Sequence, residues 1–328
     1  MIKKRELVIV GGGPAGMAAA LAAYKYGIRD ILLLERGRFL GGMLNQCIHT
    51  GFGLEYFNAA LTGPEYAERF IDKVCKIEEI DVRTGAFVAD LTADKVLTVL
   101  QKGGFERVKA RSLIMATGCR ERTREMIHVA GDRPAGVFSA GFAQQLINTE
   151  GLLPGREAVI VGSGDIGMIM ARRLILEGMT VRGIVEVEGH SRGLVRNFVQ
   201  CVKDFEIPLY FRHKVLAIKG RRRVEKVVLC KVDDRQREIP STAFELACDT
   251  VLFSVGLIPE NELVEKAGVV MNRETNTPDS SEPGRTSIAG LFVSGNCCKI
   301  YDLVDSVTRD SEKVARYAAE YLGHPVAR

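Results

Sequence analysis

The chain has 328 residues, of which 46% are hydrophobic and 26% are charged, a composition typical of a globular protein with enough apolar residues for two cores. A net charge of +4 is too small to indicate nucleic-acid binding, and no apolar run approaches the roughly 20 residues that cross a bilayer. The eight cysteines show neither a C-x-x-C nor a metal-ligand spacing, and no secretory signal precedes the first expected strand. We therefore expect a cytoplasmic protein with reduced thiols, no metal site, no transmembrane segment and no nucleic-acid partner.

The first expected elements are a strand, a helix and a second strand over residues 6–35. An apolar strand leads into Gly11-Gly12-Gly13-Pro14-Ala15-Gly16, a helix is predicted over 15–26, and the second strand ends at Glu35. This is the glycine fingerprint of a dinucleotide site, with its acid about 20 residues further on. The first glycine makes a tight turn, the second lets the backbone approach a pyrophosphate, and the third lets the helix pack on the strand. The helix N-terminus then offers N–H groups to the phosphates.

A loop rich in glycine and aromatic residues follows over residues 41–63. Thr62, Pro64 and Glu65 then form a capping-box pattern, which predicts the start of a second helix. Three short β-like runs and a strand lead into the turn Thr117-Gly118; they cover residues 85–91, 96–101, 106–109 and 112–116.

A second fingerprint, Gly162-Ser163-Gly164-Asp165-Ile166-Gly167, again follows an apolar strand. Its acid, Glu186, ends the next apolar run at the same spacing as in the first fingerprint. One such motif is weak, but two complete motifs, each with its strand and its acid, predict two bound dinucleotides. Electron transfer between them is the simplest reason to hold both, so we expect a redox enzyme.

The remaining elements predict a return to the first domain. Two hairpin-like segments over residues 213–232 and 233–239 precede a strand at 250–255 that ends in Gly256, and an amphipathic helix is expected over 305–322. The predicted fold is α/β, with two Rossmann-like dinucleotide-binding domains and the second inserted into the first. The expected bounds are 1–120, 121–247 for the insertion, and 248–328.

These motifs, with the turn Ala116-Thr117-Gly118 and the late Gly295-Asn296, resemble the two-dinucleotide-binding-domain flavoproteins, the pyridine-nucleotide-dependent FAD oxidoreductases. The resemblance implies that the first site binds FAD, that the inserted domain binds NAD(H), and that the layout is thioredoxin-reductase-like. Disulfide reductases of this group need a cysteine pair. The stretch 136–143, where thioredoxin reductases carry theirs, has no cysteine, and Cys47 has no partner cysteine nearby in the sequence.

Several segments resemble a narrower subgroup. These are Gly295-Asn296 in place of the usual Gly-Asp, residues 44–53, and Asp302-Leu303-Val304-Asp305. The subgroup comprises the FAD/NAD(H)-binding, NADH oxidase-type subunits that accompany glycerol-3-phosphate, proline or opine dehydrogenases. This resemblance implies an FAD-dependent NADH oxidoreductase that exchanges electrons with oxygen, with another small acceptor or with a flavoprotein dehydrogenase subunit. It also implies a small iron-sulfur or metal protein as a further partner.

The resemblance assigns the cofactor-binding residues as follows. For FAD they are Gly11, Gly13, Pro14, Ala15, Gly16, Glu35, Arg36, Gly42, Asn45, Gln46, Val88, Ala116, Thr117, Gly118, Gly295, Asn296 and Val304. For NAD they are Gly162, Gly164, Asp165, Ile166, Gly167, Glu186 and Gly256. No metal ligand and no certain catalytic residue is assigned.

Several alternatives stay open on the sequence. Cys47 and His49 are candidates for chemistry beside the flavin, although a packing role for Cys47 is favoured because no base or resolving cysteine is evident. Glu186 favours NAD over NADP, but His190, Arg192 and Arg196 carry compensating charge. A ferredoxin or flavodoxin NADP reductase, a disulfide-reductase-like enzyme and a non-enzymatic nucleotide-binding scaffold are the other functions considered.

Overall fold

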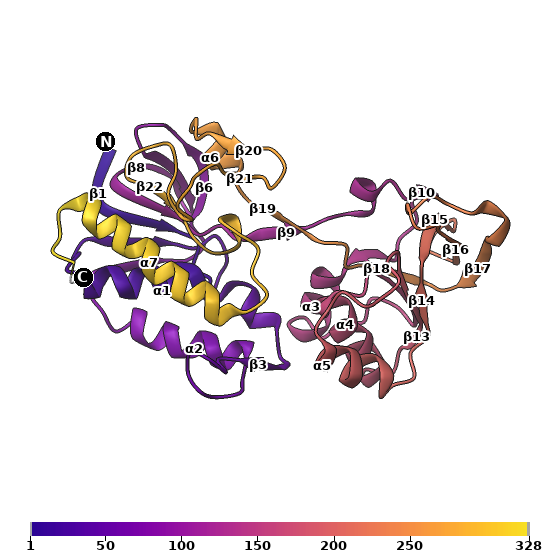
Figure 1. Cartoon of the computed structure of the whole chain (residues 1–328). Coiled ribbons are helices and arrows are strands. Elements are labelled where there is room, and N and C mark those ends of the chain that lie inside the picture. Colours follow the sequence, from indigo (N-terminus) through magenta and orange to yellow (C-terminus); the bar gives the residue numbers. More distant parts are fainter. Residues whose placement is uncertain (1, 327–328) are drawn as a thin grey trace. The chain divides into compact units, whose positions relative to one another are not determined.

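The computed structural model describes residues 2–326 of the chain (Figure 1). The chain divides into two compact units: unit 1 holds the chain up to Arg120 and from Ile258 onward, and unit 2 holds Glu121–Leu257. The chain leaves unit 1 along β9 (Cys119–Glu121) and returns along β19 (Leu257–Pro259). The predicted α/β fold, with one nucleotide-binding unit inserted into another, is confirmed.

The expected return at residue 248 is wrong. Strand β18 (Thr250–Phe253) pairs in parallel with β12 (Glu157–Val161), so it is part of the sheet of unit 2. Its fully buried side chains Val251 and Leu252 pack in the two cores of that unit. Unit 2 therefore ends after this strand, at Leu257.

Unit 1 is built on a seven-stranded sheet in the order β5-β2-β1-β8-β7-β6, with β22 paired to β8. Its strands are β1 (Ile2–Val10), β2 (Ile31–Leu34), β5 (Ile80–Arg83), β6 (Phe87–Leu91), β7 (Val96–Gln101), β8 (Gly104–Met115) and β22 (Leu291–Val293). Its longer helices are α1 (Pro14–Lys25), α2 (Gly63–Val74) and α7 (Val304–Leu322). Short elements complete the unit: β3 (Thr50–Phe52), β4 (Leu61–Thr62), α6 (Glu262–Lys266), β20 (Met271–Asn272) and β21 (Thr277–Pro278).

The apolar runs of the first fingerprint become central strands because both of their faces are covered. Leu7 and Ile9 point into a core shared with α1, α2 and α7, whereas Val8 and Val10 point into a second core on the other face. Figure 1 shows α1, α2 and α7 together on one side of this sheet. Parallel strands covered on both faces read as continuous hydrophobic runs.

The predicted helix ends agree closely with the structure. The capping box at the start of α2 is present: Thr62 Oγ1 accepts from the Glu65 N–H at 3.4 Å, and Glu65 Oε2 accepts from the Thr62 N–H at 2.7 Å. Such caps replace hydrogen bonds that the first turn of a helix lacks.

Unit 2 holds a five-stranded parallel sheet in the order β11-β18-β12-β13-β14 and a smaller sheet in the order β10-β15-β16-β17. The further elements are β10 (Ala130–Gly131), β11 (Val137–Ser139), α3 (Ala140–Asn148), α4 (Asp165–Leu176), β13 (Thr180–Glu186), α5 (Val195–Phe198), β14 (Leu209–Phe211), β15 (His213–Lys219), β16 (Lys226–Lys231) and β17 (Phe244–Ala247). The hairpin expected over 213–232 is confirmed as β15 and β16.

The second expected hairpin, over 233–239, is present in a short form, closed by an antiparallel bridge between Val232 and Glu238. Those residues make a tight turn, in which Asp233 Oδ1 accepts from the Arg237 N–H at 2.9 Å. The third strand is β17, where Phe244 and Leu246 pack on the core between the two sheets. In this strand apolar residues alternate with exposed ones, and the apolar positions could be read from the sequence.

Candidate dinucleotide sites

The first and third glycines of the first fingerprint are required by the protein itself. Gly11 has a φ of +111°, and a Cβ there would overlap the carbonyl oxygen of Ala116, the residue that follows the neighbouring strand β8. A Cβ at Gly16 would overlap the carbonyl oxygen of Gly11. These two glycines therefore bring β1, β8 and α1 together.

Gly13 has no such reason to be glycine. Its φ of −76° suits any residue, and a Cβ there would meet only Gly42 Cα, at 3.9 Å. α1 begins directly afterwards without a side-chain cap, so the N–H groups of its first turn have no side-chain acceptor. A glycine that leaves open space beside uncapped N–H groups matches the place where a pyrophosphate approaches the backbone.

The Glu35 carboxylate accepts hydrogen bonds from the fingerprint turn and from the loop after β2. Its Oε2 accepts from the Gly12 N–H at 2.7 Å and its Oε1 from the Gly37 N–H at 2.6 Å. Each carboxylate oxygen can accept a further hydrogen bond. The acid thus fixes the loop and keeps acceptor capacity for ribose hydroxyls.

Residues distant in the sequence meet at this turn. A Cβ at Gly295, whose φ is +71°, would lie 2.7 Å from Ala15 Cβ and 3.7 Å from Val307 Cγ1. A Cβ at Gly42 would lie 3.0 Å from Gly13 Cα. The structure therefore brings the fingerprint, the start of the short 3-10 helix Gly42–Gln46 and the late Gly-Asn together.

The amide of Asn296 is held at both ends. Its Nδ2 donates to Cys119 Sγ at 3.4 Å, and its Oδ1 accepts from the Tyr301 N–H at 3.3 Å. The adjacent turn is held by Thr117 Oγ1, which donates to the Glu260 carbonyl at 2.7 Å. Where the resemblance expects an acid, this chain places an amide of defined orientation.

The other residues assigned to the first site differ in how far their side chains are exposed. Val88 lies on β6 with its side chain in the core, which leaves only its backbone for a ligand. Arg36 is exposed, and Asn45 Nδ2 donates to the Leu40 carbonyl at 2.8 Å. Gln46 is buried in the 3-10 helix.

The second fingerprint repeats the geometry of the first. Gly162 has a φ of +99°, and a Cβ there would overlap the Ser254 carbonyl oxygen, while a Cβ at Gly167 would crowd the Gly162 carbonyl oxygen. Gly164 has a φ of −67°, and its nearest neighbour would be Ser254 Oγ at 4.0 Å. α4 also begins without a side-chain cap. The middle glycine is again the one that the protein itself does not require.

Glu186 is more deeply buried than Glu35, with 3% of its surface exposed. Its Oε2 accepts from the Ser163 N–H at 2.9 Å and the Ser163 hydroxyl at 2.7 Å, and its Oε1 accepts from the Glu188 N–H at 3.0 Å. These bonds hold a negative charge at the carboxyl end of β13, beside the fingerprint turn.

The sequence did not reveal how the segment after β13 folds over this turn. The Gly193 N–H donates to the Ser163 carbonyl at 3.1 Å, and the Leu194 N–H donates to Asp165 Oδ1 at 2.8 Å. Asn197 Nδ2 donates to the same carboxylate oxygen at 2.7 Å. Asp165, expected to contact NAD, therefore anchors this segment through its side chain.

Arg122 is a further residue that the sequence reading missed. Its N–H donates to the Gly256 carbonyl at 3.0 Å, and its side chain lies 3.7 Å from the place of a Cβ on Gly256. Its exposed guanidinium puts a positive charge beside one of the predicted NAD-binding residues.

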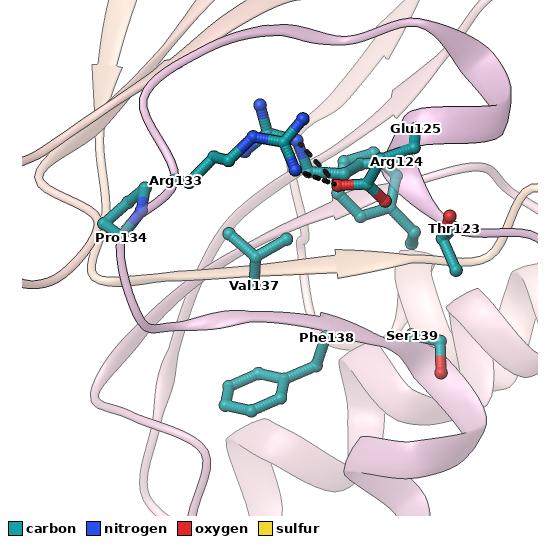
Figure 2. Close-up of a pocket in the computed structure, with 9 residues that line it drawn as sticks. Thr123, Arg124, Glu125, Arg133, Pro134, Val137, Phe138 and Ser139 are labelled. Atoms are coloured by element: carbon teal, nitrogen blue, oxygen red, sulfur yellow. Dashed lines mark ion pairs between the residues drawn. The ribbon is translucent and has the colours of Figure 1, made fainter.

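A pocket of about 280 Å³ lies in unit 2 near the ends of β11 and β18 (Figure 2). Val137, Phe138 and Phe253 provide apolar walls, and Glu125 lies 3.5 Å from Arg133 in an ion pair above them. The volume is slightly below the range of most small-molecule sites. No residue assigned to either dinucleotide lines this pocket.

Cys47 is placed for packing rather than for nucleophilic chemistry. Its side chain is 8% exposed, and its thiol donates to the Met43 carbonyl at 3.2 Å. Burial raises the pKa of this thiol to about 12, so the reactive thiolate is scarce at neutral pH. His49 contacts the Thr50 carbonyl through Nδ1 at 3.3 Å and lies beside Phe52.

Cys47→Ser should therefore keep most of the rate of flavin reduction by NADH, within about threefold of the parent, because a neutral buried thiol takes no part in hydride transfer. Stopped-flow absorbance under anaerobic conditions measures that rate. Loss of turnover, or a sulfenic acid trapped at Cys47 in the oxidised protein, would contradict the packing role.

Two general features of the described residues bear on function. Residues 2–326 hold no group of three or more His, Cys, Asp or Glu side chains placed to bind a metal ion. Within the same range no helix is long and apolar enough to span a membrane.

Comparison with known proteins places these sites in context. The family profile described as "Pyridine nucleotide-disulphide oxidoreductase" matches residues 5–315. An opine oxidase subunit of Agrobacterium tumefaciens (strain Ach5) is 26% identical over 318 residues, which cover 89% of this chain and 61% of that protein. The NAD(P)H sulfur oxidoreductase (CoA-dependent) of Pyrococcus abyssi is 27% identical over 305 residues, with coverages of 89% and 62%. The chain thus spans about three fifths of the length of these curated relatives.

Among solved structures, the thioredoxin reductase of T. acidophilum aligns with a TM-score of 0.78 at 22% identity. The alignment covers 97% of this chain and 98% of that one. At this level of identity the likeness describes the fold.

Proposed function

The chain belongs to the pyridine nucleotide-disulphide oxidoreductase family, and we propose that it transfers a hydride between NAD(H) and FAD and exchanges the electrons with a partner dehydrogenase subunit or a small acceptor such as oxygen. Proteins of this family bind FAD and NAD(P)H, so the two cradles have a flavin dinucleotide and a nicotinamide dinucleotide as their cofactors. When bound, the flavin and nicotinamide rings supply the hydride chemistry, while the protein provides binding, orientation and electrostatics.

The observation that carries the proposal is the contrast within each fingerprint. The outer glycines are required by close backbone contacts, whereas Gly13 and Gly164 face open space beside uncapped helix N-termini. A protein without ligands at these turns has no need of glycine there. Each cradle is completed by a carboxylate, Glu35 or Glu186, fixed by hydrogen bonds from the turn.

Glu186 supports NAD rather than NADP as the nicotinamide substrate. Its carboxylate is held by Ser163 and Glu188, so it cannot turn away from a ligand without losing those bonds. A 2′-phosphate near this charge would be repelled. Arg192 and Arg196 are exposed on the segment that follows, and they are the cations able to offset the repulsion.

The exchange of electrons with a partner is supported by what surrounds the first cradle. The sequence has no C-x-x-C that could relay electrons from the flavin to a thiol substrate. Phe39, Leu54 and Ile300 are exposed on loops that flank the cradle, and Met43 is exposed on the adjoining 3-10 helix. The opine oxidase relative is itself named as part of a larger assembly. We propose that the loops at 51–63 and 299–302 meet a flavoprotein dehydrogenase subunit of the glycerol-3-phosphate dehydrogenase type, with a small iron-sulfur or metal protein as a further partner.

Anaerobic NADH should bleach the flavin absorbance of the purified chain, and should do so faster than NADPH at equal concentration. With oxygen or a dye present, the chain alone should show modest NADH turnover, and should reduce no dye with glycerol 3-phosphate or proline. Bound flavin that NADH never bleaches would contradict the proposal. Faster bleaching by NADPH would show that Arg192 or Arg196 outweighs Glu186. Dye reduction by glycerol 3-phosphate without NADH would reveal a substrate site within this chain.

A further inference from the structure

The antiparallel strands β6, β7 and β8 carry a row of apolar side chains on their outer face. Phe87 lies directly opposite Leu100, and Leu100 lies directly opposite Phe105. Cross-strand partners project from the same face of a sheet, so the three side chains form a continuous ladder. They are 47%, 42% and 71% exposed, respectively. The neighbouring row, Val88 and Val99, points into the core.

Two cations flank this ladder. Lys102 lies in the turn that joins β7 to β8, and Arg107 lies two residues after Phe105 and so on the same face. Both are exposed, and neither forms an ion pair with any of residues 2–326. We call Phe87, Leu100, Phe105, Lys102 and Arg107 the meander patch.

The acidic groups near the meander patch are already paired. Glu106 is opposite the buried Val99 on the core-facing row, and its carboxylate bridges Lys3 and Arg83, each at 2.5 Å. Asp90 Oδ1 lies 2.7 Å from Lys266 Nζ. Asp90 is also in register with Thr98, which lies opposite Arg107, so its carboxylate partly offsets the charge of Arg107. The patch therefore presents apolar surface with a net positive charge carried mainly by Lys102.

We propose that the meander patch docks on an anionic lipid surface. Its three apolar side chains expose on the order of 300 Å², whereas a stable protein interface removes about 800 Å² from each partner. A bilayer sets no such requirement, because binding grows with the apolar area that enters the interface and with each basic residue near anionic headgroups. The turn at Lys102 puts a cation and the most exposed side chain of the patch, Phe105, at one end of a hairpin.

The patch is separate from the cofactor residues. Val88 is the one residue of the three strands assigned to FAD, and its side chain faces the core rather than the patch. Variants at positions 102, 105 and 107 therefore leave both fingerprints intact, and lipid binding can be tested independently of hydride transfer.

The test is cosedimentation of the full chain, loaded with FAD, with vesicles of phosphatidylglycerol and phosphatidylcholine, or of phosphatidylcholine alone. The protein should bind the anionic vesicles and leave them as salt is raised, since surface charge is screened. Lys102→Gln and Arg107→Gln should each weaken partitioning about fivefold, and Phe105→Ser about tenfold. Leu152→Ser, at an apolar side chain of unit 2 that is 57% exposed, and Arg222→Gln, at an exposed cation of unit 2, are the matched controls and should change nothing.

Equal flavin content and an equal unfolding midpoint establish that each variant is folded. The proposal is overturned if anionic vesicles bind no protein, or if the control variants weaken binding as much as the patch variants. It is also overturned if Phe105→Ser instead abolishes a concentration-dependent dimer in light scattering, because the face would then be covered by a second copy of the chain. NADH-driven flavin reduction should be unchanged in every variant.

Discussion

Gly13→Val should yield a folded protein that has lost its FAD. The Cβ of the new residue meets no protein atom closer than ordinary contact, because its nearest neighbour is Gly42 Cα at 3.9 Å. The side chain instead fills the space beside the N-terminus of α1, which we assign to the pyrophosphate. We expect a loss of flavin affinity of about a hundredfold, roughly 2.7 kcal/mol, with the free energy of unfolding of the apoprotein changed by no more than about 1 kcal/mol. The ratio of flavin to protein absorbance after purification, with chemical denaturation, measures both quantities.

Gly16→Val is the informative contrast. A side chain there would overlap the Gly11 carbonyl oxygen, so this variant should lose stability as well as flavin. If Gly13→Val itself fails to fold, Gly13→Ala provides the smaller test, with weakened flavin binding in a stable protein. Full flavin content in both Gly13 variants would show that this loop does not hold the pyrophosphate.

Gly164→Val should keep FAD but lose its response to NADH. The backbone of Gly164 suits a side chain, and the nearest atom to its Cβ would be Ser254 Oγ at 4.0 Å. The side chain would occupy the approach to the N-terminus of α4, so the second-order rate constant for flavin reduction by NADH should fall about a hundredfold. Anaerobic stopped-flow absorbance at several NADH concentrations gives that constant.

Chemical reduction with dithionite provides the control, because it needs no nicotinamide site and should bleach the Gly164→Val protein as fast as the parent. A parental rate with NADH would mean that the nicotinamide dinucleotide binds elsewhere in the chain. A loss of both FAD and the NADH response would mean that the substitution disturbs more than one cradle.

The two fingerprints were predictable because each encodes local geometry. A strand, a glycine turn, a helix and an acid at a set spacing form one unit, and the structure has these units at β1-α1-β2 and β12-α4-β13. The role of each glycine follows from the motif, and the third glycines contact the carbonyl oxygens of Gly11 and Gly162 within it. The contacts that require the first glycines were not predictable, because Ala116 and Ser254 lie far away in the chain and come close only once the sheets are formed.

The parts that the sequence did not predict depend on bonds between distant segments. Asp305, buried in the first turn of α7, accepts from the Gly53 N–H at 3.2 Å and the Tyr56 N–H at 2.8 Å, and so ties down a loop that reads as free in the sequence. Asp165 anchors the segment at Leu194 in the same way. The end of unit 2 was placed too early in the sequence analysis because β18 pairs with β12. The sequence of neither strand alone indicates which strand it pairs with.

The insertion of unit 2 also affects the order in which the protein can form during synthesis. β22 and α7 belong to unit 1 but are made only after the whole of Glu121–Leu257, and the Ser112 hydroxyl on β8 donates to the carbonyl of Gly290, 178 positions later. A growing chain can thus complete the contiguous unit 2 while the earlier strands of unit 1 still lack a neighbour. The open edge of β8 is then exposed to chaperones or to other nascent chains. We expect FAD, whose proposed cradle includes Gly295, to join only after that interval and so to mark the end of folding.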